Sequence, residues 1–186
     1  MRNFLKIAEG IDIIPLLHAV QNHPELWDKE NTFRNDFENS PHKETQSIWL
    51  RYNDLTEYYA DGCLDCAIED LEAINYSAWE LLPEARQIIF NLMRRVEGQR
   101  LGRVIITKLP AGKTITPHAD TRGAYAEYYT RYHLPLQNLP GSIFKADDEQ
   151  VYMRHGECWW FRHEATHEVI NNSADDRIVL IVDIRV

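Results

Sequence analysis

Cysteine, basic residues and long apolar runs are all scarce in this sequence, and each shortage narrows what the protein can be. There are three cysteines. Cys63 and Cys66 form a lone C-x-x-C with no second pair, which is a weak signal for a zinc site or a redox motif, so we expect ordinary reduced thiols in a polar loop. Cys158 precedes two tryptophans and is predicted to be a small buried hydrophobic residue.

Basic side chains are outnumbered, with 20 lysines and arginines against 29 acidic residues and a formal net charge of −9. Nucleic acids and anionic membranes attract basic surfaces, so this balance argues against broad binding to either. No apolar run approaches the roughly 20 residues of a membrane span, and the start of the sequence lacks the apolar core of a signal peptide. We therefore expect a cytoplasmic protein that binds neither nucleic acid nor membrane.

The length of 186 residues and a hydrophobic content of 44% predict one domain with a sizeable core, residues 1–186. Residues 1–100 are expected to supply helical and loop support and a lid. Apolar residues at helical spacing predict helices over residues 11–20 and from Pro83 to Gly98. Residues 27–45 are polar and have no sustained period, which is typical of a loop, here one that could cover a mouth of the fold. A short strand is expected at residues 46–52.

After Gly98 the pattern changes to short β-rich runs separated by Gly, Pro and Asp. Strands are expected at residues 102–109, 114–120, 128–136, 143–146, 150–153, 157–161, 167–171 and 178–186. So many short strands at even spacing indicate a mainly β jelly roll, formed by residues 101–186, with helices against one outer face.

The segment Thr116 to Asp120 offers an imidazole and a carboxylate on alternate residues. If the segment is extended, His118 and Asp120 point to the same face and can reach one cation. His167, from a distant strand, is the best candidate for a third ligand. His-x-Asp followed by His is the facial triad of non-haem iron(II) oxygenases, which leaves coordination positions open. A His and an Asp two residues apart also occur often by chance.

Arg177 stands just before the final apolar run of the chain. A guanidinium at the edge of such a strand is costly to bury without an anion, and its planar fork suits a carboxylate. A dicarboxylate that chelates iron at one end could place its far carboxylate there. The alternative is an exposed arginine paired with Asp175 or Asp176.

From about Gly102 onwards the sequence resembles the aspartyl/asparaginyl β-hydroxylase family of iron(II)- and 2-oxoglutarate-dependent dioxygenases, which share a double-stranded β-helix of the cupin-like jelly-roll type. The resemblance is carried by these motifs: Pro117-His118, Arg131-Tyr132-His133-Leu134, Gly156-Glu157, His167-Glu168-Val169, and Arg177 with Ile181-Val182-Asp183. Animal aspartyl hydroxylases lack a carboxylate two residues after the first histidine, whereas Asp120 is present here and completes the triad.

The resemblance implies iron(II) held by His118, Asp120 and His167, with 2-oxoglutarate and dioxygen as cosubstrates. Arg177 resembles the residue that binds the distal carboxylate of 2-oxoglutarate. Other residues implied at the cosubstrate are Arg131, His133 and Thr107. The implied reaction is hydroxylation of an amino-acid side chain, free or within a peptide or protein, with release of succinate and carbon dioxide.

Substrate contacts are expected from the loop after the first ligand strand, with these candidates: Arg122, Tyr125, Tyr128 and Tyr129. His155 and His163 lie beside arginines, which favours solvated or hairpin-edge positions. Two rival functions use the same residues differently. A cupin-type hydrolase or isomerase would hold zinc with two histidines and a carboxylate, and a non-catalytic jelly-roll module would bind a carbohydrate or protein. The sequence sets no oligomeric state.

Overall fold

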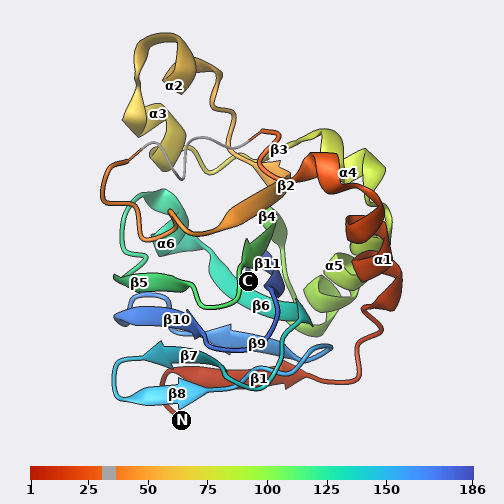
Figure 1. The fold of residues 1–186 in the computed structure, drawn as a ribbon. Coiled ribbons are helices and arrows are strands. Elements are labelled where there is room, and N and C mark those ends of the chain that lie inside the picture. Colours follow the sequence, from red (N-terminus) through yellow and green to blue (C-terminus); the bar gives the residue numbers. More distant parts are fainter. Residues whose placement is uncertain (31–36) are drawn as a thin grey trace.

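The computed structural model describes residues 1–30 and 37–186. Two antiparallel sheets face each other and form the double-stranded β-helix (Figure 1). The larger sheet has the order β1-β9-β6-β11-β4-β2-β3 and the smaller has the order β5-β10-β7-β8. The strands of the larger sheet are β1 (Phe4–Ala8), β2 (Gln46–Tyr52), β3 (Ile74–Asn75), β4 (Arg100–Leu109), β6 (Thr130–Gln137), β9 (Cys158–Phe161) and β11 (Arg177–Arg185).

The smaller sheet contains β5 (Thr114–His118), β7 (Ser142–Ala146), β8 (Glu149–Val151) and β10 (His167–Asn171). The prediction of a mainly β jelly roll is confirmed. One difference is that β1 and β3, in addition to the expected strand β2, join the larger sheet, so the first 100 residues supply more than support and a lid. β1 was missed because Phe4–Ala8 alternates poorly, with exposed residues at both its second and third positions.

The helices are α1 (Ile14–Asn22), α2 (Thr56–Asp61), α3 (Leu64–Glu69), α4 (Ser77–Leu81), α5 (Glu84–Arg95) and α6 (Ala124–Tyr128), with a 3-10 turn η1 at Pro24–Leu26. Figure 1 shows α1, α4 and α5 together on one side of the sheets, and α2 with α3 at the end opposite β1 and β8. The two predicted helices correspond to α1 and α5. Among the described residues, no helix has the length and apolar character needed to cross a membrane.

The strand β11 shows how the sheet separates core from site. Ile178, Leu180 and Val182 face the helices and pack with apolar residues of α1 and α5. The alternate residues Arg177, Val179, Ile181 and Asp183 face the opposite side, toward the interior between the two sheets. A second apolar cluster lines that interior and includes Phe4, Leu109, Ile115, Phe144, Phe161 and Val169. The inner face of the larger sheet therefore lines the interior in which polar residues of β11 are placed.

The cysteine expectation holds only in part. Cys158 is a free and fully buried thiol, and burial raises its pKa to about 12. Cys63 is disulfide-bonded, so the expectation of reduced thiols is wrong for that residue. Part of the predicted polar loop, residues 31–36, lies outside the described residues.

Candidate active site

His118 and His167 lie directly opposite each other on neighbouring strands, because β5 and β10 pair in a register that matches these two residues. Their ring centroids are 4.2 Å apart. The Nδ1 atom of His118 is 2.8 Å from the carbonyl oxygen of Thr116, and that of His167 is 2.9 Å from the carbonyl oxygen of Ala165. A carbonyl only accepts, so each Nδ1 carries the proton and each Nε2 keeps a lone pair for a metal ion.

Asp120 completes the group but does not lie on the predicted strand. β5 ends at His118, and the backbone N–H of Asp120 donates to the carbonyl oxygen of His163 at 2.9 Å, which holds the irregular segment after β5 in place. Its Oδ1 lies 3.6 Å from His118 Nε2, and its Oδ2 lies 4.0 Å from His167 Nε2. The strand prediction for residues 119 and 120 is therefore wrong, although the carboxylate still reaches the two imidazoles.

The three side chains fit a divalent metal ion. One ligand atom from each lies within 4.8 Å of the others, and ligands bound at about 2.0–2.2 Å to one ion stand at most about 4.4 Å apart, so a small closure brings them into range. Two imidazoles and one carboxylate suit iron and leave positions open. Burial lowers the pKa of His167, which keeps this imidazole neutral and able to act as a ligand.

Arg177 is a buried cation that forms no ion pair with the described residues. It is the first residue of β11 and is 3% exposed. Its side chain lines a cavity of about 30 Å³ together with His167, Thr107 and His133. Its Nη2 has no hydrogen-bond partner, and no carboxylate within the described part of the chain pairs with the guanidinium. Burial alone lowers the pKa of Arg177 to about 10. The alternative pairing with Asp175 or Asp176 is not observed.

The other predicted cosubstrate residues surround the same small cavity. Thr107 is buried on β4 and pairs in register with Val179 of β11. His133 is buried on β6, with its ring 4.9 Å from that of Phe161 and 5.4 Å from that of Phe144. Two strands of the larger sheet thus place both residues beside Arg177, because each points to the inner face.

Arg131, which the resemblance implies at the cosubstrate, donates hydrogen bonds to two carboxylates. Its Nε and Nη2 donate to the two oxygens of Asp183 at 2.8 and 2.9 Å, and its Nη1 donates to Asp120 Oδ2 at 2.5 Å. Burial would lower the pKa of Arg131, but Asp183 and Asp120 raise it above its usual value. This arginine therefore contacts two carboxylates, one of them in the candidate metal-binding group of His118, Asp120 and His167.

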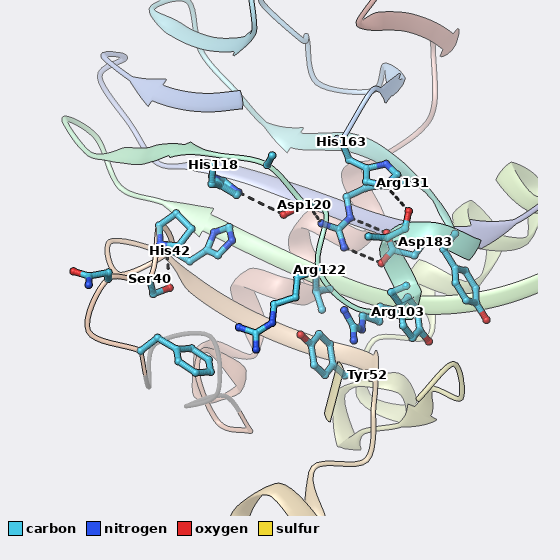
Figure 2. A pocket seen from close by; sticks show the side chains of 18 residues that line it. Ser40, His42, Tyr52, Arg103, His118, Asp120, Arg122, Arg131, His163 and Asp183 are labelled. Atoms are coloured by element: carbon cyan, nitrogen blue, oxygen red, sulfur yellow. Dashed lines mark hydrogen bonds and ion pairs between the residues drawn. The ribbon is translucent and has the colours of Figure 1, made fainter. Parts of the chain in front are cut away.

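A larger cavity of about 500 Å³ opens beside the metal-binding group, and four residues line both it and the small cavity: His42, His118, Asp120 and Arg131. Figure 2 shows Arg122 extending into this space between the loop that carries Ser40 and His42 and the ring of Tyr52. Arg122 is exposed and lines the cavity, as predicted for a substrate contact.

Of the three predicted tyrosines, two line the larger cavity. Tyr125 and Tyr129 are stacked with ring centroids 4.4 Å apart, and both hydroxyls donate to the carbonyl oxygen of Leu71. Tyr128 does not line it: the side chain is exposed, and its ring lies 5.9 Å from the guanidinium of Arg185. Positions i and i+4 share one face of α6 while Tyr128 is on another, which the expected strand over residues 128–136 could not show.

Several lining residues were missed by the sequence analysis. His42, from the patternless polar loop, has its ring 5.0 Å from that of His118. Arg103 lies 3.9 Å from the ring of Tyr125 and 4.6 Å from that of Tyr52. His163 is buried rather than solvated, with its Nε2 3.0 Å from the carbonyl oxygen of Ala126. No local pattern marks His42, whereas Arg103 alternates with Ile105 and Thr107 on β4 and could have been placed on the inner face.

The fold and the arrangement of two histidines, a carboxylate and a buried arginine define a non-haem iron oxygenase of the 2-oxoglutarate-dependent class. Within that class, the family model described as aspartyl/asparaginyl beta-hydroxylase matches residues 20–186, and the chain belongs to this family. The resemblance found in the sequence is confirmed, as are the expected enzyme class and its cofactors, iron(II) and 2-oxoglutarate. A comparison with curated proteins finds no match.

Solved structures share the fold at low sequence identity. A prolyl hydroxylase from Trichoplax adhaerens, in complex with a hypoxia inducible factor peptide fragment, has a TM-score of 0.63 and 11% identity, with 100% of this chain and 84% of that chain covered. The viral collagen prolyl hydroxylase of Paramecium Bursaria Chlorella virus-1 has a TM-score of 0.57 and 10% identity, covering 98% and 95%. A Pseudomonas putida prolyl-4-hydroxylase has a TM-score of 0.53 and 14% identity, covering 100% and 93%.

Proposed function

We propose that this protein hydroxylates an amino-acid side chain, free or within a peptide, and that it converts 2-oxoglutarate and dioxygen to succinate and carbon dioxide in doing so. In this proposal His118, Asp120 and His167 hold iron(II). Arg177 binds the distal carboxylate of 2-oxoglutarate, with Thr107 and His133 beside it.

The observation that carries the proposal is the unpaired guanidinium of Arg177. A buried cation is expensive unless an anion accompanies it, and this one shares a cavity with His167. A planar guanidinium binds a carboxylate at two points. An anionic ligand that spans from Arg177 to the metal-binding group satisfies both ends of the cavity, and a five-carbon 2-oxo dicarboxylate has the two functional groups required.

The size of the small cavity adds a condition. A volume of about 30 Å³ has room for little more than water. The cosubstrate must therefore extend from Arg177 toward the residues that border both cavities, which include His118 and Asp120. Its oxo acid end would then lie next to the metal-binding group, and the larger cavity would remain for the substrate.

Bound iron(II) supplies the activation of dioxygen, with 2-oxoglutarate as the source of two electrons, so that one oxygen atom enters a C–H bond and the other enters succinate. The protein's own residues hold, orient and enclose the reactants. His118 and His167 are held by their Nδ1 hydrogen bonds. Apolar rings, including Phe144 and Phe161, line the cosubstrate cavity and exclude water from it.

The larger cavity supports a small or single-side-chain substrate. Its volume of about 500 Å³ lies within the usual range for small-molecule sites. Two lining arginines, Arg103 and Arg122, have no carboxylate partner among the described ion pairs, in contrast to Arg131. Arg103 already donates to the amide oxygen of Asn53, whereas Arg122 is exposed to the cavity. We therefore favour a substrate that presents a carboxylate near the hydroxylated carbon, either as a free amino acid or as an acidic residue of a peptide.

The proposal is tested by anaerobic titration of the iron(II)-loaded protein with 2-oxoglutarate. Arg177→Met should weaken 2-oxoglutarate binding at least tenfold, since it removes a charge-assisted fork worth about 1.5–3 kcal/mol, and should leave iron binding intact. His167→Ala should weaken both. Arg185→Met, an exposed arginine on the same strand, is the matched control and should change neither.

Admission of oxygen with panels of free amino acids and of peptides then measures succinate release. Acidic substrates should stimulate succinate formation more than their amides. Wild-type protein that binds no 2-oxoglutarate in the presence of iron would refute the proposed function, and a zinc-dependent hydrolase would then be the better reading. Equal iron affinity in His167→Ala would refute the ligand assignment alone.

A further inference from the structure

Asp183 is a buried carboxylate to which the proposed chemistry has so far given no role. It lies on the inner face of β11, is 2% exposed, and stands opposite Arg131 in the pairing of β11 with β6. Both of its oxygens accept hydrogen bonds from Arg131, at 2.8 and 2.9 Å. This two-point geometry fixes both the position and the plane of the guanidinium.

The same guanidinium continues to the metal-binding group. With Nε and Nη2 held by Asp183, Nη1 of Arg131 points at Asp120 Oδ2, 2.5 Å away. Figure 2 shows the resulting chain from Asp183 through Arg131 to Asp120. Asp183 of the larger sheet is thereby connected to Asp120, in the irregular segment that follows β5 of the smaller sheet.

Asp120 is the member of the group that most needs such support. His118 and His167 lie on paired strands, whereas Asp120 lies in an irregular segment after β5, and its side chain is 26% exposed. With Oδ2 held by Arg131, Oδ1 lies 3.6 Å from His118 Nε2. We propose that Asp183 is a positioning residue for the metal site, and that it acts through Arg131 to fix the orientation of the Asp120 carboxylate beside the two imidazoles. This inference rests on the proposed function, because it takes His118, Asp120 and His167 as the metal ligands.

Charge leads to the same conclusion as geometry. Arg131 and Asp183 together are neutral, so Asp120 contributes its full negative charge to a divalent ion. Without Asp183, an uncompensated guanidinium would lie against the ligand carboxylate in a partly buried site, where charges interact more strongly than in water. Loss of Asp183 would therefore both loosen Asp120 and repel the ion.

The test is the affinity of Asp183→Asn for Co(II), titrated without oxygen and without 2-oxoglutarate and followed by cobalt absorption. Asparagine keeps the volume of the side chain and removes the charge. We expect a loss of affinity of about 10–100-fold, as for other residues that orient metal ligands, with a changed cobalt spectrum. Glu157→Gln is the matched control, because Glu157 is also a buried carboxylate in an ion pair, with Lys6 at 3.0 Å, and does not line either cavity of the site. It should keep the wild-type Co(II) affinity even if it lowers stability.

Coupling to Arg131 separates positioning from a general effect on the fold. If Asp183 acts through Arg131, then adding Asp183→Asn to Arg131→Met should cause no further loss of Co(II) affinity. Arg131→Lys gives a second test should Asp183→Asn fail to fold: lysine keeps the charge but cannot hold both carboxylates in a fork, so affinity should fall.

Three outcomes distinguish the ideas. Wild-type Co(II) affinity in folded Asp183→Asn, or in Arg131→Lys, overturns the positioning role and leaves the proposed function standing. Additive losses in Arg131→Met and Asp183→Asn overturn the route through Arg131. Failure of the wild-type protein to bind Co(II) overturns the proposed metal site and this inference together.

Discussion

At the scale of single residues, the site is marked by charges that the fold leaves incompletely balanced. Arg177 is buried with an unpartnered Nη2, while Arg131 at the other end of the inner face has two carboxylates. The first arrangement is unfavourable for the protein alone and becomes favourable when an anion binds. The second is already satisfied, which suits an orienting role.

Arg177→Met is accordingly predicted to stabilise the ligand-free protein while removing its affinity for 2-oxoglutarate. Burial lowers the pKa of Arg177 to about 10, below its ordinary value of 12.5, which means that the charged form is disfavoured in the folded state. This cost is fully present below pH 10 and is relieved only as the pH rises through 10, so it applies at neutral pH. A gain on the order of 1–3 kcal/mol is expected.

Urea unfolding of the metal-free protein at pH 7.5 measures this gain. The control is Arg51→Met, because the Arg51 guanidinium donates to the carbonyl oxygens of Gly102 and Ala73 and its removal should destabilise. A clear loss of stability in Arg177→Met would mean that the guanidinium already has a stabilising partner.

The residues of the metal-binding group were predictable from the sequence because their spacing carries chemistry. His118, Asp120 and His167 follow a known ligand pattern, and Arg177 precedes a run too apolar to leave a guanidinium in water. His42 and Asp183 were not predictable as site residues. The position of His42 is set by a loop without periodicity. Asp183 ends an apolar run, and its contact with Arg131 follows from the pairing of β11 with β6, which the sequence does not give.

At the scale of elements, most strands and the two longer helices were predicted well, and the short helices were not. β2 was expected over residues 46–52 and runs from Gln46 to Tyr52. α2, α3, α4 and α6, with five or six residues each, were missed because one turn and a half shows no clear period. Their positions depend on contacts between distant segments, such as the packing of α3 against α6.

That packing gives a prediction for Gly123, which begins α6. Its φ is 81°, and a Cβ added there would lie 2.5 Å from the carbonyl oxygen of Ile68 in α3. Gly123→Ala must therefore strain the backbone and displace α3 from α6. We expect a loss of stability of about 2–4 kcal/mol, combining a left-handed alanine with a steric clash, and weaker substrate binding, because Tyr125 lies on α6 and Tyr129 directly follows it.

Gly112→Ala is the matched control for the clash. Gly112 has a similar φ of 75°, but an added Cβ there would meet nothing within 4 Å. It should lose only the smaller backbone cost, about 1 kcal/mol. Thermal unfolding of the two variants compares them directly, and equal losses would show that α6 does not depend on close contact with α3.

At the scale of the whole molecule, the site joins the two sheets. His118 and His167 come from the smaller sheet, and Asp120 is connected through Arg131 to Asp183 in the larger one. The apolar cluster between the sheets is held by the hydrophobic effect, which is non-directional. A metal ion bound by these three ligands would add a directional connection, so metal binding should stabilise the fold as a unit.

Metal addition is therefore predicted to raise the unfolding midpoint, and the increase should vanish in acid. A ligand at 100 times its dissociation constant stabilises a protein by about 2.7 kcal/mol. Burial lowers the pKa of His167 below its ordinary value of 6.5, so the unfolded chain takes up the proton first. The contribution of this histidine to stability is therefore present above pH 6.5 and is lost as the pH falls toward and through the lowered value.

Thermal unfolding with and without Co(II) from pH 5 to pH 8 should show a metal-dependent increment near neutrality that shrinks in acid. His167→Gln should abolish the increment at every pH, whereas His155→Gln, which changes an exposed histidine, should retain it. If Co(II) raises the unfolding midpoint of His167→Gln as much as that of the wild-type protein, the stabilising metal binds elsewhere. Metal binding would then not connect the two sheets.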